Sequence, residues 1–177
     1  SEHVARLAAE CSGRVINWAG DGCFLTFDMS SAGVMFALRL QQVHADEPDL
    51  PEVRVGIHLG EVTETPDASG GPPRIGGLAV DLASRICGLA KPGQVLMSSA
   101  VYNSARQRLG VEAFGQPVLW QTHGTYALKG FDKPMEIGEA ALQGLAPRET
   151  RGSGDRAKPI RHPQPARATK KSRRSAL

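Results

Sequence analysis

The sequence predicts one domain that mixes helices and strands, in either the α/β or the α+β class. Helical and strand patterns alternate along the chain, which favours layers of helices and sheet. An Asp-Gly pair at residues 21 and 22 separates two short runs of strand character, a pattern typical of a β-hairpin and of a sheet that is not purely parallel. Residues 52–62 alternate strictly between large apolar side chains and a set that includes two glycines, which indicates a strand with two unlike faces.

The hairpin is expected from residues 14–19 and 23–27, with Asp21 near its tip. Residues 29–48 then predict a helix that ends before Pro48, with Ser30 or Ser31 as its N-cap. One stripe of this helix is expected to face the core. It consists of Gly33, Phe36, Ala37, Leu40 and Val43.

The strand in 52–62 directs Val53, Val55, Ile57 and Leu59 to one face and Arg54, Gly56, His58 and Gly60 to the other. Residues 63–77 are rich in Gly and Pro and predict a loop or irregular arm. A helix follows in 77–93, stopped by Lys91, Pro92 and Gly93, with an apolar stripe of Leu78, Leu82, Ile86 and Leu89. The remaining elements are expected to be a strand at 94–99, a short helix at 99–110 and strands at 124–130 and 135–142.

Composition limits the class of protein. With 177 residues, 41% of them hydrophobic, the chain can bury one real core. Apolar runs are too short to span a bilayer and the first residues lack the apolar region of a secretory signal, so we expect a cytoplasmic protein. The three cysteines have no CxxC spacing, which favours free thiols over disulfides or a zinc site.

Charge divides the chain in two. Residues 1–144 contain 11 Lys and Arg against 16 Asp and Glu, whereas residues 145–177 contain 10 against 2. The second region has four prolines and few large apolar residues, so we expect the domain to occupy 1–144 and 145–177 to form a disordered basic tail. Its KKSRR cluster lacks aromatic residues for stacking on bases, so a solvated tail is favoured over nucleic-acid binding.

Four segments together resemble the catalytic domain of class III adenylate/guanylate cyclases, and the resemblance covers about residues 10–142. They are GDG at 20–22, EVRVGIHLGEV at 52–62, GLAVDLASRICGLAKPGQVLMSS at 77–99 and HGTYALKGFDKPMEI at 123–137. The resemblance implies an α+β fold with a ferredoxin-like βαββαβ core. It also implies a head-to-tail dimer, as a homodimer or with a complete cyclase domain, whose active site lies at the interface.

The resemblance implies roles for particular residues. Forming a 3′,5′-cyclic nucleotide from ATP or GTP expels pyrophosphate, and two Mg²⁺ or Mn²⁺ ions bound by carboxylates suit that chemistry. Asp21 is then one of two metal-bridging aspartates, and Gly22 beside it leaves room for the phosphates. Arg85 matches the arginine that stabilises the transition state, and Lys129 would hold the terminal phosphates.

The chain also departs from the family pattern. Its beginning resembles the end of the family's first helix, so the preceding strand and its aspartate are expected to be missing, which would leave an unpaired, apolar sheet edge. Asp81 stands where the family has an asparagine that orients the ribose. The pair that selects the base falls on Asn17 and near Arg74, which indicates neither ATP nor GTP.

Each assignment has a structural alternative. Arg85 could be a solvated or ion-paired helix residue, Lys129 part of a turn, and His58 a packed, hydrogen-bonded histidine rather than a metal ligand.

Three hypotheses follow for the whole chain. It is a cyclase domain that is completed by a further segment or partner, an inactive cyclase-like regulatory and dimerisation module, or a nucleic-acid binder with a basic tail.

Overall fold

The computed structural model describes residues 2–71, 73–145 and 157–160. Four α-helices occupy this part of the chain: α1 Glu2–Glu10, α2 Ser30–Asp46, α3 Leu78–Leu89 and α4 Ser99–Arg106. A short 3-10 turn covers Val111–Ala113. The strands are β1 Gly13–Ala19, β2 Gly22–Phe27, β3 Val55–Ile57, β4 Thr63–Thr65, β5 Arg74–Gly76, β6 Val95–Ser98, β7 Val118–Leu128, β8 Met135–Leu142 and β9 Ala157–Ile160.

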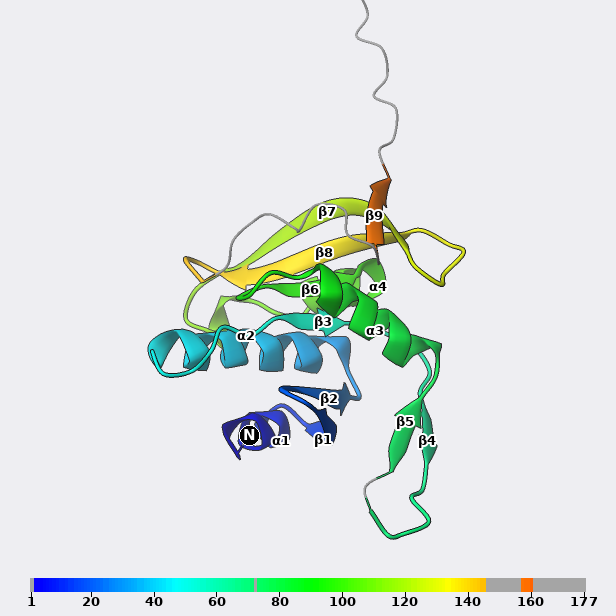
Figure 1. The fold of residues 1–177 in the computed structure, drawn as a ribbon. Coiled ribbons are helices and arrows are strands. Elements are labelled where there is room, and N and C mark those ends of the chain that lie inside the picture. The colour runs from blue at the N-terminus through cyan, green and yellow to red at the C-terminus, as the bar shows by residue number, and fades with distance from the viewer. Residues whose placement is uncertain (1, 72, 146–156, 161–177) are drawn as a thin grey trace, which may run out of the picture.

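The main sheet has five strands in the order β3-β6-β8-β7-β9. Strands β3 and β6 are parallel, whereas the other neighbouring pairs are antiparallel. The hairpin β1–β2 and the hairpin β4–β5 form two separate small sheets, and β4–β5 projects from the body as an arm (Figure 1). This mixed sheet with helices confirms the α+β class that the sequence predicts.

Both faces of the sheet are buried, and strand β6 shows why. Val95 and Met97 point to one face, where they pack with residues of α2 and α4. Leu96 points to the other face and packs with Leu82 and Ile86 of α3. Because successive side chains of a strand alternate between faces, an apolar run such as Val-Leu-Met forms a strand buried on both sides.

A third core lies beneath the hairpin. Helix α1 contributes Val4, Leu7 and Ala8, which pack with Phe36 and Leu40 of α2. Figure 1 shows α1 and the β1–β2 hairpin on one side of α2 and the five-stranded sheet on the other. Helix α2 therefore carries apolar residues around most of its circumference and joins the two parts.

The hairpin and the main sheet are not hydrogen-bonded to each other. Within the described residues β3 pairs only with β6, so its other edge is open, and its residues Val55 and Ile57 are only half-buried. Phe27 at the end of β2 and Ile57 both approach Gly33 of α2, which is where the two parts meet. This arrangement agrees with the expected open, apolar sheet edge.

Several predicted details differ in the structure. The N-cap of α2 is Met29 rather than Ser30 or Ser31, and no side chain caps the helix. Leu78 is 64% exposed, so it does not belong to the buried stripe of α3. The strand expected over 52–62 is regular only at Val55–Ile57, because its pairing with β6 covers only three residues.

Strand β8 has the predicted bounds, whereas β7 starts earlier than expected and two further strands appear in regions predicted as irregular or disordered. Strand β7 begins at Val118, six residues before the predicted start at 124. The expected loop at 63–77 contains the short hairpin β4–β5. Strand β9 lies within the range predicted as disordered and pairs antiparallel with Thr125–Leu128. Its Pro159 fits an edge strand, where a missing N–H is tolerated. Residues 146–156 and 161–177, the rest of the predicted tail, lie outside the described residues.

The described part of the chain offers no helix with the length and apolar character needed to cross a membrane. Its cysteines are free thiols: Cys11 is buried, and Cys23 and Cys87 are half-buried. Burial raises the pKa of all three thiols above its usual range, so they favour the neutral form.

Candidate functional site

Asp21 lies at the tip of the β1–β2 hairpin. Ala19 pairs with Gly22, so Gly20 and Asp21 are the two loop residues, one position earlier than the Asp-Gly pair suggests. Gly20 has φ +63°, which glycine adopts at little cost, and it therefore supplies the turn geometry. Asp21 and Gly22 are exposed, and the Asp21 carboxylate makes no hydrogen bond or ion pair with any described residue.

Asn17 lies on the same hairpin, four residues before Asp21. A bulge between Val15 and Asn17 shifts the register of β1 against β2, and Asn17 pairs with Phe24. A bulge increases local twist and redirects side chains, and here the Asn17 side chain is exposed. The hairpin thus presents Asn17, Asp21 and Gly22 to solvent from one two-stranded element.

Gly56 determines where α3 lies. A Cβ atom at Gly56 would be 2.5 Å from the carbonyl oxygen of Ala83 and 2.6 Å from Cα of Cys87, both backbone atoms of α3. A Cβ atom at Gly60 would be 2.8 Å from Cβ of Ala79. The glycine-lined face that the sequence predicts for this segment is therefore the surface on which α3 packs at close range.

Asp81 and Arg85 are four residues apart on α3 and therefore lie on the same side of the helix. Asp81 is exposed in the first turn, where the helix dipole favours a negative charge, and Arg85 is half-buried. Neither side chain makes an ion pair or hydrogen bond within the described residues. The structure thus gives no support to the ion-paired alternative for Arg85.

Lys129 and Arg74 lie on two further elements. Lys129 directly follows β7, is exposed and precedes Gly130, which has φ +88°. The glycine satisfies the turn, so the lysine side chain is not needed for it. Arg74 begins β5, is exposed and stands opposite Thr65 in the β4–β5 arm. Both cations are unpartnered among the described residues.

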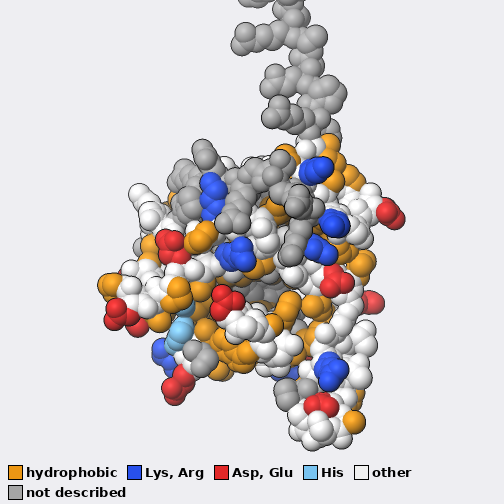
Figure 2. Space-filling view, in the orientation of Figure 1, with side chains coloured by type: hydrophobic (Ala, Val, Ile, Leu, Met, Phe, Trp, Pro, Cys, Tyr) orange, Lys and Arg blue, Asp and Glu red, His pale blue; other side chains and the backbone are white. Residues whose placement is uncertain are grey.

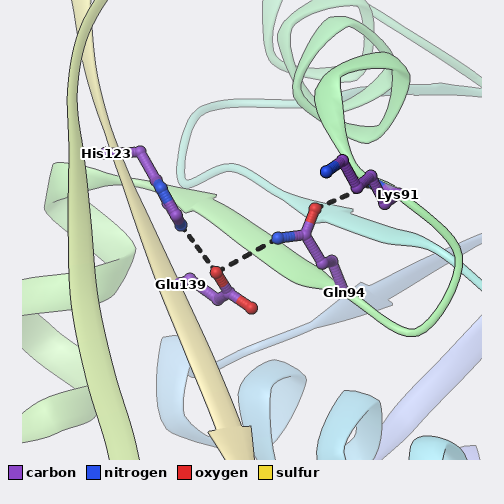
Figure 3. A network of polar contacts seen from close by, with 4 residues as sticks. All are labelled: Lys91, Gln94, His123 and Glu139. Atoms are coloured by element: carbon purple, nitrogen blue, oxygen red, sulfur yellow. Dashed lines mark hydrogen bonds and ion pairs between the residues drawn. The ribbon is translucent and has the colours of Figure 1, made fainter. Parts of the chain in front are cut away.

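A buried polar network supports the strands and the end of α3 (Figure 3). His123 Nε2 donates to Glu139 Oε2 at 2.6 Å, and Gln94 Nε2 donates to the same oxygen at 3.2 Å. The backbone N–H of Lys91, just after α3, donates to Gln94 Oε1 at 2.8 Å. The network therefore links the end of α3 to β8 and to β7, the strand that leads to Lys129.

The sequence analysis did not identify this network, although one signal was present. In the strand at 135–142, Glu139 shares a face with Ile137 and Ala141, which are apolar and buried. A carboxylate on a buried face is retained only with hydrogen-bonding partners, so Glu139 predicts a polar network. Its other oxygen, Oε1, has no partner within the described part of the chain.

His58 agrees with its interpretation as a packed histidine. Its Nδ1 lies 2.9 Å from Oγ of Ser98, a buried residue at the end of β6. Burial lowers the pKa of His58 below its usual range, which favours the neutral ring.

The predicted site residues are not gathered into one pocket by this chain. They lie on the hairpin, the arm, α3 and the turn after β7, and two cavities among the described residues lie elsewhere. The larger has a volume of about 120 Å³ and lies over β7 and β8. No group of three or more His, Cys, Asp or Glu residues that could hold a metal ion occurs among the described residues. Because Asp21 supplies only one carboxylate, the described residues of a single chain do not fit a two-metal site.

Comparisons with known proteins bear on the family. No family model matches the chain. It is 30% identical over 132 residues to "Putative adenylate cyclase 3" of Rhizobium meliloti. The matched region covers 71% of this chain and 20% of that protein. It is 33% identical over 99 residues to an adenylate cyclase of Streptomyces coelicolor, covering 54% of this chain and 24% of the relative. It is also 29% identical over 137 residues to the serine/threonine-protein kinase pkn2 of Myxococcus xanthus, covering 74% of the chain and 15% of the kinase.

Solved structures show the same fold. An adenylate/guanylate cyclase/hydrolase from Silicibacter pomeroyi aligns with TM-score 0.65 and 23% identity, covering 81% of this chain and 80% of that one. An adenylate cyclase from Trypanosoma brucei, studied in its monomeric state, aligns with TM-score 0.66 and 21% identity, covering 85% of this chain and 81% of that one. At these identities the structures establish the fold alone.

In sequence the chain is similar to adenylate cyclases, and its fold is that of class III adenylate/guanylate cyclase domains. It spans about a quarter or less of the length of the curated relatives it matches. The fold predicted from the four sequence segments is confirmed. The roles of individual site residues stay predictions.

Proposed function

We propose that this domain supplies part of a composite nucleotide cyclase site, formed with a second chain, that converts ATP or GTP into a 3′,5′-cyclic nucleotide and pyrophosphate for intracellular signalling in the cytoplasm. One observation carries the proposal. Asp21 on the hairpin and Asp81 and Arg85 on α3 are unpartnered, and the described chain does not bring them together. Polar groups without partners in their own chain are available to a ligand. A second copy or a related domain could place the hairpin residue of one chain opposite the α3 residues of the other.

The reaction defines what each residue would do. The ribose 3′-oxygen loses its proton and forms a bond to the α-phosphorus, while the bond from that phosphorus to the oxygen bridging to the β-phosphate breaks. Arg85 would donate hydrogen bonds to the phosphate oxygens where charge develops, and Lys129 would bind the departing pyrophosphate. Asn17 and Arg74 would contact the base, and Gly22 would leave space for the phosphates.

Mg²⁺ or Mn²⁺ is the expected cofactor of the assembled site, with Asp21 as one ligand. No described residue of the same chain joins Asp21 in a group of three or more His, Cys, Asp or Glu residues that could hold a metal ion, so a second carboxylate would come from the partner. In an assembly of two copies, Asp21 and a carboxylate of the other copy would bind the metal ions. In an assembly with a complete cyclase domain, the partner would bring both aspartates, this chain would supply Arg85 and Lys129, and Asp21 would have no role in that site.

An inactive, cyclase-like dimerisation module is the second candidate. The residue that favours it is Asp81, because a carboxylate beside a triphosphate repels it unless a cation intervenes. Asn17 and Arg74 also depart from the family's base-selecting pair. In this case the domain would bind a cyclase partner and regulate it without turning over nucleotide.

The direct test incubates the purified chain with Mg²⁺ or Mn²⁺ and with ATP or GTP, and measures cyclic nucleotide. We expect the chain alone to give no more product than its Asp21→Ala variant, because one carboxylate cannot position two metal ions about 3.5 to 4 Å apart. Clear product that disappears in Asp21→Ala would show that the chain assembles a complete site unaided, and would contradict the need for a partner's aspartates.

A further inference from the structure

Two histidines meet at the surface where α1 packs against the end of α2. His3 of α1 and His44 of α2 are 41 residues apart in sequence, yet their Nε2 atoms are 3.1 Å apart. The ring centroids are 5.1 Å apart, and the planes are tilted by 57°. Both side chains are half-buried, and Figure 2 shows histidine atoms at the lower left of the surface, with a basic side chain directly beside them and acidic side chains nearby.

The hydrogen bond on the far side of His44 fixes its tautomer. His44 Nδ1 lies 2.7 Å from the carbonyl oxygen of Pro51. A carbonyl oxygen only accepts, so Nδ1 carries the proton and the neutral ring directs the lone pair of Nε2 toward His3. Metal-binding histidines are typically oriented in the same way, by donating their other N–H to a carbonyl or carboxylate.

We propose that His3 and His44 form a binding site for a transition-metal ion, with Zn²⁺ as the representative ion, which links α1 to α2. A tetrahedral Zn²⁺ bound by two imidazole nitrogens at about 2.0 to 2.1 Å holds them about 3.3 Å apart, close to the separation in this structure. His3 Nδ1 has no partner among the described residues, so it can carry the proton while Nε2 binds the metal. Imidazole nitrogens favour Zn²⁺, Cu²⁺ and Ni²⁺ over Mg²⁺, which prefers oxygen.

The charges around the pair shape the site. Burial lowers the pKa of His3 below its usual range, and the electrostatic effects of His44 and Arg6 act in the same direction, whereas Glu47 acts in the opposite direction. Glu47, the exposed C-cap residue of α2, adds negative charge near His3 that favours a cation, and Arg6 opposes it. No third His, Cys, Asp or Glu residue completes a metal-binding group within the described chain. Water would therefore fill the remaining positions, and the affinity would be lower than that of four-residue structural zinc sites.

A metal ion at this site would affect the helices on which the β1–β2 hairpin packs. Helix α1 packs on β1, the first strand of the hairpin that carries Asp21, and on α2 through Val4, Leu7 and Leu40. A metal ion that binds both helices would stabilise this packing. The inference does not depend on the proposed cyclase function, because it concerns only the folded domain.

The experiment measures thermal unfolding of the full chain with ZnCl₂, and Zn²⁺ binding by calorimetry. At Zn²⁺ concentrations about fivefold above Kd, we expect Tm to rise by about 2 to 4 °C, with one binding event that is lost in His3→Gln and in His44→Gln. Glutamine retains hydrogen-bonding capacity but is a poor Zn²⁺ ligand. MgCl₂ should give no such shift, and His58→Gln, a histidine outside the pair, should retain the response.

His44→Gln is the decisive variant, because a metal ion held by His3 and nearby backbone groups alone would not require His44. A Zn²⁺ response that persists in His44→Gln would overturn the proposal. The absence of any Zn²⁺ binding to the unmodified chain would also overturn it, and would leave an imidazole–imidazole hydrogen bond as the role of the pair.

Discussion

At the scale of single residues, the buried polar groups of this domain hold the strand ends in place. His58 and Ser98 join β6 to the segment that follows β3. Glu139 on β8 binds His123 of β7 and Gln94, and Gln94 in turn binds the backbone of Lys91, two residues after α3. A hydrogen bond of this kind contributes only about 1 kcal/mol net, but leaving a buried partner unsatisfied costs about 1 to 3 kcal/mol. The main effect of these buried hydrogen bonds is therefore to disfavour other arrangements of the strands.

The pKa of His58 makes a prediction about pH. Burial lowers the pKa of His58 in the folded state below the usual value of 6.5, so between these two values the unfolded chain binds a proton more readily. The contribution to stability is therefore present above pH 6.5 and is lost as the pH falls through the folded-state pKa. Urea unfolding at pH 7.5 and 5.5 should show a loss of stability that is smaller in His58→Asn. An equal loss in both proteins would show that His58 does not contribute.

At the scale of elements, the close packing of α3 on β3 positions Asp81 and Arg85. The helix lies against the strand because Gly56 lacks a side chain, and the adjoining atoms belong to the helix backbone. Backbone atoms cannot turn aside as a flexible side chain can. A larger residue at 56 must therefore move the whole helix.

We expect Gly56→Ala to lower the free energy of unfolding by about 1 to 3 kcal/mol, as overpacked core substitutions do. The matched control is Gly88→Ala on α3, because a Cβ atom at Gly88 meets no atom within 4 Å. Alanine favours a helix over glycine by about 1 kcal/mol, so this control should be neutral or stabilising. Chemical denaturation measures both changes. An equal effect of the two substitutions would contradict the close packing of α3 on β3.

The sequence predicted elements well where apolar periodicity determines them. Helices α2 and α3 and strand β8 follow the expected stripes and alternation, and the glycine-lined face at 54–60 is confirmed by its contact with α3. Element ends were harder to predict. Met29 occupies the N-cap position of α2 although two serines follow it, and Leu78 is exposed although it fits the helical stripe. Leu78 is the first residue of α3, and its exposure depends on how the end of the helix packs, which the local pattern does not encode.

At the scale of the whole molecule, the domain has two bodies joined through α2. One is the hairpin with α1, and the other is the five-stranded sheet with α3 and α4. The predicted site residues are divided between these two bodies and the arm. The fold of one chain therefore does not show how they would come together in one site. The resemblance identified candidate residues by type and order, whereas Glu139 and the His3–His44 pair depend on contacts between distant segments.

The central claim is that this domain contributes Arg85 and Lys129 to a site completed by another chain. The measurement is cyclic nucleotide formation after mixing this chain with a complete class III cyclase domain whose own transition-state arginine has been replaced by alanine. The account predicts product from the mixture and from neither protein alone. Arg85→Ala in this chain should reduce that product by about 10² to 10³. Asp21→Ala should leave it unchanged, because the partner brings both aspartates. If the two chains associate but product stays at background, or forms equally with Arg85→Ala, the claim is contradicted.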